Sequence, residues 1–120
     1  MIVVAGYTHI DATRRADALA AAKPYIDAAR ERGGCNAYSW TPCPDDPARV
    51  YVFEEWDDEA ARAAHLAGDT YATMLGHLSQ FDVRDTEVKK YRVDLAEPVY
   101  DPEGVARADF FTDPKAGGAG

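Results

Sequence analysis

The sequence predicts an α+β domain in which an antiparallel sheet carries helices on one face. Strand-like stretches, rich in branched and aromatic residues, cover residues 2–10, 35–41, 49–56 and 83–95. Helix-like spacing of apolar residues fills the intervals 12–32 and 57–80. The resulting order, β-α-β-β-α-(α)-β, is the split βαβ arrangement of ferredoxin-like domains. The chain has 120 residues and no internal repeat, so we expect one domain.

The first strand and first helix follow directly from this patterning. Odd positions of the strand, including Tyr7 and His9, share one face, and even positions share the other. Asp11 is a candidate N-cap for the helix. Pro24 predicts a kink or a restart within it, and Gly33-Gly34 predicts its end. The expected inner face of the helix consists of Leu19, Ala22, Ile26 and Ala29.

The centre of the chain predicts a hairpin followed by two helices. The loop PCPDDP, residues 42–47, separates strands 35–41 and 49–56. Asp57 is the expected cap of a short helix that Gly68 closes. The expected inner residues of this helix are Ala60, Ala61, Ala64 and His65. Those of the next helix, residues 70–80, are Tyr71, Met74, Leu75 and Leu78.

The uncovered face of such a sheet predicts self-association. We expect this face to expose Ile2, Val4 and their neighbours, a patch too apolar for a monomer. Face-to-face pairing of two sheets would bury it, so the pattern predicts a homodimer and a dimeric α/β barrel. On strand 35–41, Tyr38 and Trp40 are expected at the dimer interface or in the barrel lining.

The C-terminal part forms an extension of the domain. We place the domain at residues 1–97 and the extension at 98–120, with disorder expected over TDPKAGGAG, residues 112–120. The extension still carries apolar side chains that would reach the partner subunit: Val99, Tyr100, Phe110 and Phe111.

Charge and cysteine content narrow the classes of function. With 13 basic and 21 acidic residues the net charge is −8, which argues against nucleic acid or an anionic membrane as partner. The longest apolar stretch, MIVVAG, is too short for a membrane span or a signal peptide. Cys35 and Cys43, about 26 Å apart along an extended strand, cannot pair with each other and suit the cytoplasm. No zinc or other metal motif occurs in the sequence.

Three segments together resemble a known family. They are GGCNAYSW, RVYVFEEWDDEAARAAH and GDTYATMLGHL. In the antibiotic biosynthesis monooxygenase family of dimeric α/β-barrel proteins, a Gly-Cys begins the second strand and an acidic-x-Trp ends the third. An Ala-rich helix ending in His follows. Gly34-Cys35, Glu54-Glu55-Trp56 and the helix ending at His65 supply these features, and the resemblance spans about residues 1–95.

The resemblance implies an oxygenase that needs neither metal nor flavin. Its substrates would be electron-rich aromatics of the quinol or anthrone type, which react with O2 once deprotonated. In a haem-degrading branch of the family an Asn, a Trp and a His carry the chemistry. Those positions hold Tyr7, His65 and Leu75 here, so haem degradation is not expected.

His65 is the candidate catalytic base, because a reference pKa of about 6.5 suits removal of a phenolic proton near neutral pH. A hydrogen-bonded core histidine is the structural alternative. Trp56, Tyr71, Tyr7 and His9 are candidate substrate-binding residues, with Tyr7 and His9 included if their strand face meets the helices. Each aromatic side chain could equally fill the core.

Glu54 and Glu55 cannot act as a carboxylate pair, because adjacent strand residues point to opposite faces. One of them is expected to be solvated or bound to Lys89, Lys90 or Arg92. Two other functions remain open on the same scaffold. One is a non-redox isomerase, cyclase or lyase, and the other is a small-molecule-binding protein without catalysis.

Overall fold

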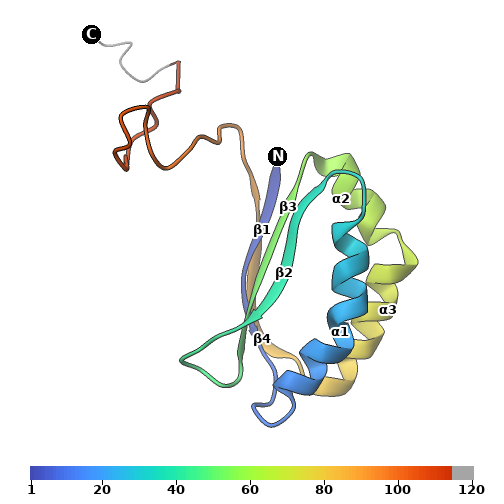
Figure 1. Cartoon of the computed structure of the whole chain (residues 1–120). Helices are drawn as coiled ribbons and strands as arrows, with labels where there is room; N and C mark the ends of the chain where they lie inside the picture. Colours follow the sequence, from blue (N-terminus) through green and yellow to red (C-terminus); the bar gives the residue numbers. More distant parts are fainter. Residues whose placement is uncertain (115–120) are drawn as a thin grey trace.

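The computed structural model describes residues 1–114 and contains one four-stranded antiparallel sheet with its helices on one face (Figure 1). The strand order is β2-β3-β1-β4. This confirms the predicted α+β, ferredoxin-like fold. In chain order the elements are β1 (Ile2–His9), α1 (Arg15–Arg30), β2 (Cys35–Pro42), β3 (Arg49–Trp56), α2 (Glu59–Leu66), α3 (Asp69–Leu78), the 3-10 turn η1 (Ser79–Phe81) and β4 (Arg84–Arg92).

The helices lie on the face of the sheet to which the even residues of β1 point. Ile2, Val4 and Thr8 are buried there, whereas Tyr7 and His9 lie on the other face. The expectation that Ile2 and Val4 would be on the uncovered face is therefore wrong. Strand β1 is apolar on both faces, so alternation alone does not show which face meets the helices. The uncovered face instead exposes large side chains of β3, with Tyr51 at 43% and Phe53 at 40%.

Helix α1 continues through Pro24 without a restart. Two of its four buried residues, Ala22 and Ile26, lie on either side of the proline and belong to the core, and this packing offsets the lost backbone hydrogen bond. The helix begins after Arg14 rather than at Asp11. The carboxylate of Asp11 instead accepts hydrogen bonds from the backbone N–H and the hydroxyl of Thr13.

Helix α2 is rotated relative to the predicted inner face. His65 is buried and Ala61 and Arg62 are half-buried, whereas Ala60 and Ala64 are exposed. The helix packs closely on Gly34: a Cβ at Gly34, whose φ is +84°, would lie 2.5 Å from the Cβ of Ala61. The N-cap is Asp58 rather than Asp57, and its side chain accepts a hydrogen bond from the backbone N–H of Ala61 at 2.8 Å.

Strand β2 faces the helices with Tyr38, which is buried, and Trp40, which is half-buried. The two side chains belong to the core and to the cavity described below. This excludes them from the uncovered face that was expected to form a dimer interface.

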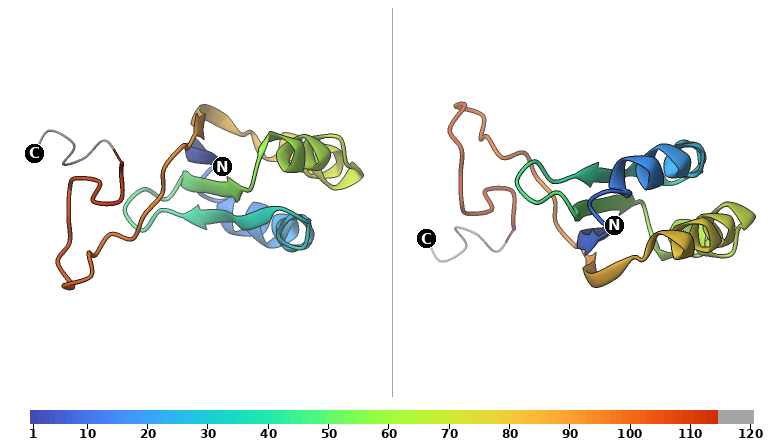
Figure 2. Two further views of the ribbon diagram at one scale, coloured as in Figure 1. Left: turned by 90° about the horizontal axis from the view of Figure 1, so that it is seen from above. Right: turned by 90° about the horizontal axis from the view of Figure 1, so that it is seen from below.

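Beyond β4, residues 93–114 form an arm that leaves the sheet on the side opposite the helices (Figure 2). Its backbone is held by a bridge between Tyr100 and Ala106, and the Glu97 carboxylate accepts hydrogen bonds from the backbone of Phe111 and Thr112. Several of its apolar side chains are exposed, Val99 at 65% and Tyr100 at 62%. Of the end expected to be disordered, residues 115–120 lie outside the described residues.

Candidate functional site

A cavity of about 370 Å³ lies between the helix-facing side of the sheet and helix α3. Most of its wall is apolar or aromatic, and the polar exceptions are hydroxyl groups, one carboxylate and one guanidinium. This volume and lining are in the range of small-molecule sites. The residues that line it are Val4, Thr8, Tyr38, Trp40, Val52, Glu54, Arg62, Tyr71, Met74, Leu75, Leu78, Ser79, Val83, Thr86 and Val88.

Glu54 is the acidic residue of this wall. It is 7% exposed, because it falls in the buried phase of β3 together with Val52 and Trp56. One carboxylate oxygen, Oε1, accepts a hydrogen bond of 2.9 Å from the indole Nε1 of Trp56 and lies 3.8 Å from Nε of Arg62. Burial raises the pKa of Glu54, and the bond from Trp56 and the charge of Arg62 oppose that rise. The carboxylate is therefore a more basic proton acceptor than an ordinary surface glutamate.

His65 lies behind the cavity wall. Its ring centroid is 4.9 Å from that of Trp56, 5.4 Å from Tyr38 and 5.5 Å from Tyr71. Both ring nitrogens are buried, and neither has a hydrogen-bond partner within residues 1–114. Burial, then the nearby charges of Arg32 and Arg62, lower the pKa of His65, so the imidazole is neutral at pH 7.

Tyr71 and Tyr38 form the wall between His65 and the cavity. Tyr71 is half-buried near the start of α3. Tyr38 directs its hydroxyl at the sulfur of Met74, 3.8 Å away, and burial raises the pKa of its phenol. Both tyrosines thus offer rigid aromatic surface, and the hydroxyl of Tyr71 has no hydrogen-bond partner among the described contacts.

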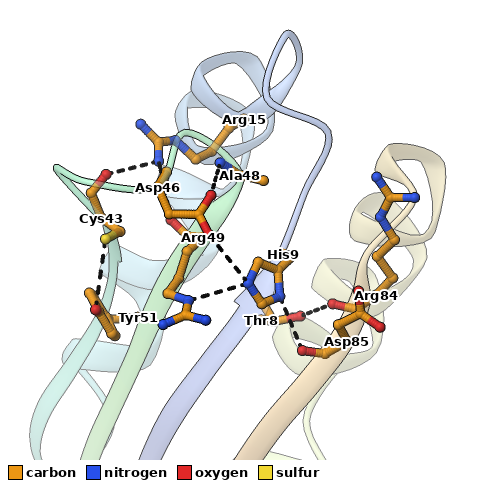
Figure 3. A network of polar contacts seen from close by, with 10 residues as sticks. All are labelled: Thr8, His9, Arg15, Cys43, Asp46, Ala48, Arg49, Tyr51, Arg84 and Asp85. Atoms are coloured by element: carbon orange, nitrogen blue, oxygen red, sulfur yellow. Dashed lines mark hydrogen bonds and ion pairs between the residues drawn. The ribbon is translucent and has the colours of Figure 1, made fainter.

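Neither Tyr7 nor His9 lines this cavity, because both lie on the uncovered face of the sheet. Figure 3 shows His9 among its polar contacts at the end of β1. Nε of Arg49 donates to Nε2 of His9 at 3.2 Å, so Nδ1 of His9 donates to the carbonyl of Asp85, also at 3.2 Å. The guanidinium of Arg49 sits 4.0 Å from the ring centroid of Tyr7. Tyr7 and His9 were expected in the pocket only if their face of β1 met the helices. That face is the uncovered one, so both residues lie outside the pocket.

The structure thus brings together Trp56, His65 and Tyr71 among the residues singled out from the sequence, and it adds Glu54 and Arg62. One of Glu54 and Glu55, without distinction between them, was expected to be solvated or bound to a basic residue of β4; Glu54 is buried and lies beside Arg62 of α2 instead. Its place in the alternation Val50, Val52, Glu54, Trp56 is the signal that could have identified it. Arg62 precedes His65 by three residues in α2 and so shares a helix face with it, which is the signal that could have identified it.

The described residues contain no group of three or more His, Cys, Asp or Glu side chains placed to hold a metal ion. Within the same range, no helix is both long and apolar enough to cross a membrane.

The split βαβ order, with one antiparallel sheet and its helices on one face, places the chain among the ferredoxin-like α+β proteins. Within that class, the family model described as antibiotic biosynthesis monooxygenase matches residues 1–76. The chain belongs to this family. The matched part contains the Glu54, Trp56, Arg62, His65 and Tyr71 cluster, whereas β4 and the arm lie beyond it.

Solved structures agree with this assignment at the level of the fold. A candidate antibiotic biosynthesis monooxygenase from Deinococcus radiodurans is 22% identical, with a TM-score of 0.75 over 84% of this chain and 100% of that one. A candidate member from Nitrosomonas europaea is 17% identical, with a TM-score of 0.70 over 79% and 100%. A conserved protein from Methanosarcina mazei is 24% identical, with a TM-score of 0.68 over 76% and 90%. No curated protein matches the chain.

Proposed function

We propose that the protein is a monooxygenase that oxidises an electron-rich aromatic, of the quinol or anthrone type, with O2 and without a metal or flavin. Family membership supports the reaction class. The observation that carries the proposal is a buried carboxylate, Glu54, in the wall of a cavity otherwise lined mainly by apolar and aromatic groups.

The first step of the proposed reaction is removal of a proton from the substrate. Glu54 takes a proton from the bound aromatic, whose anion then transfers electrons to O2 and forms a carbon–oxygen bond. For an anthrone, one oxygen atom becomes the new carbonyl oxygen and the other leaves as water with the two hydrogens of the methylene carbon. The raised pKa of Glu54 brings the carboxylate closer to the pKa of such weak acids, which favours the transfer.

His65 is the second candidate for this proton, as its neutral imidazole has two unpartnered nitrogens among the described residues. The imidazole of His65 could contact a molecule bound in the cavity only after Tyr71 or Tyr38 had moved aside. We therefore assign His65 first to positioning: its ring packs on Trp56, which holds the Glu54 carboxylate.

Oxygen uptake by metal-stripped protein, measured with anthrones, naphthoquinols and catechols above their autoxidation rate, tests the proposal. Glu54→Gln, which keeps an acceptor for Trp56, should remove nearly all of the uptake. The matched control, Glu55→Gln, makes the same change on the opposite face of β3 and should keep it. Loss of uptake in His65→Ala with full uptake in Glu54→Gln would move the role of base to His65. Uptake at the autoxidation rate with every substrate, despite binding, would refute the oxygenase and favour an isomerase or a binding protein.

We further propose that the protein is a homodimer formed through the uncovered sheet face, with residues 93–114 packing on the partner. Exposed Tyr51 and Phe53 on that face, together with Val99 and Tyr100 of the arm on the same side of the sheet, support this proposal. Static light scattering should give twice the chain mass for the native protein. Phe53→Lys should give the monomer mass, and a monomeric native protein would contradict the proposal.

A further inference from the structure

A second hollow of about 470 Å³ continues the cavity along strands β1 and β4 towards helix α2. On the helix-facing side of β4, Thr86 and Val88 line the first cavity, and Lys90 and Arg92 line the second. Residues two apart on one strand face are about 7 Å apart, so the two spaces are consecutive. Strand β1, which pairs with β4, shows the same order of the two spaces. Val4, opposite Lys90, lines the first space, and Ile2, opposite Arg92, lines the second.

The first cavity is mainly apolar, whereas the second hollow is lined in part by charged side chains. Three of the eight residues that line the second hollow are cationic, namely Arg62, Lys90 and Arg92, and one, Glu59, is acidic. Such a concentration of positive charge is unusual on a chain with a net charge of −8. The side chain of Arg62 lines both spaces and so stands at their junction.

These cations keep unused hydrogen-bonding capacity. The buried Nε of Arg62 has no hydrogen-bond partner in the described part of the chain, and its ion pair with Glu54 is long, at 3.8 Å. Arg92 faces Asp94 at a similar 3.8 Å, with both side chains largely exposed. Lys90 has no ion pair within residues 1–114. The carboxylates near the second hollow therefore do not occupy all N–H donors of these three cationic side chains, and the remaining donors can bind a ligand.

We propose that the substrate is an aromatic carboxylate, whose rings occupy the apolar cavity and whose carboxylate binds the cationic end formed by Arg62, Lys90 and Arg92. This rests on the proposed function and adds the substrate class. Guanidinium groups bind carboxylates through paired hydrogen bonds, and the ammonium of Lys90 adds a point charge. The anchored carboxylate would set the position of the rings relative to Glu54. Lys90 and Arg92 lie beyond the residues that the family model matches.

Fluorescence titration with anthracene-2-carboxylate and its neutral carboxamide tests the inference, because the two probes share their rings and differ in charge. We expect the carboxylate to bind about tenfold more tightly at low salt, with the advantage shrinking as salt is added. The double variant Lys90→Gln/Arg92→Gln should remove most of that advantage and leave carboxamide binding within about twofold. The matched control, Lys89→Gln, changes the same charge on the other face of β4 and should change neither affinity.

Each other outcome is decisive. Equal affinity for the two probes overturns the carboxylate inference and leaves the aromatic cavity supported. An equal loss for both probes in the double variant, or a loss in Lys89→Gln as large as in the double variant, also overturns it. If neither probe binds, the cavity does not accept a planar aromatic, and the proposed function fails with the inference.

Discussion

Replacing Glu54 by Gln should stabilise the folded protein at neutral pH while it removes activity. Burial raises the pKa of Glu54, so ionisation of this carboxyl costs more in the folded state than in the unfolded chain. Gln is of similar size and keeps an oxygen for the 2.9 Å bond from Trp56, but carries no charge. We expect a gain of about 1 kcal/mol in the free energy of unfolding, an ordinary magnitude for a single substitution. That corresponds to a Tm increase of about 3–6 °C.

The pH dependence of this gain follows from the direction of the pKa shift. Below the ordinary glutamate value of 4.5, Glu54 is protonated in both states, and the two proteins should be equally stable. As the pH rises through the folded-state pKa, the native protein loses stability that the Gln variant retains. Urea unfolding at pH 4.5, 6 and 7.5 measures this difference, with Glu55→Gln as the control that shows none. A Gln variant less stable than the native protein at pH 7.5 would refute the reasoning, since it would mean that Arg62 and Trp56 overcompensate burial.

Three further predictions concern the surroundings of Glu54. Because the pKa of His65 is lowered, stability of the native protein should fall as the pH drops below 6.5, and His65→Leu should flatten that fall in urea unfolding between pH 7.5 and 5. Gly34→Ala should cost about 2 kcal/mol by the same assay, because the backbone has φ +84° and the new Cβ would meet Ala61 at 2.5 Å; an unchanged free energy of unfolding would contradict this. Val88→Trp should fill part of the cavity and weaken binding of anthracene-2-carboxamide more than about tenfold, with the circular dichroism spectrum retained; unchanged binding would place the probe elsewhere.

The order of elements could be predicted because each boundary is marked in the sequence. Strand β3 was expected at residues 49–56 and is observed at Arg49–Trp56, since a proline-rich loop precedes it and two aspartates follow it. The pattern could not show which face of β1 meets the helices. Ile2 and Val4 compete with Val3 and Ala5 on the other face, and only the arrangement of the neighbouring strands and helices decides between them.

The centre of the site was partly predictable. Trp56, His65 and Tyr71 lie together, because a short β-to-α turn places the end of β3 beside α2 and α3. Of the three, only Tyr71 lines the cavity. Glu54 was missed because charged residues are rarely buried, so its charge was weighed above its position in the strand. Arg62 was missed because the alanines of α2 suggested an inner face that includes Ala60 and Ala64, which are exposed, in place of Arg62.

A single turnover under ¹⁸O2 tests the central claim most directly. Metal-stripped protein is mixed with an anthrone that binds in the cavity, and the mass of the product is measured by mass spectrometry. The same reaction is run with the Glu54→Gln variant and with native protein without oxygen. The proposed function predicts one ¹⁸O atom per product molecule, no product without oxygen and almost none with the variant. Product formed equally well without oxygen, or with no labelled atom, would contradict the monooxygenase and favour non-redox chemistry at the same site.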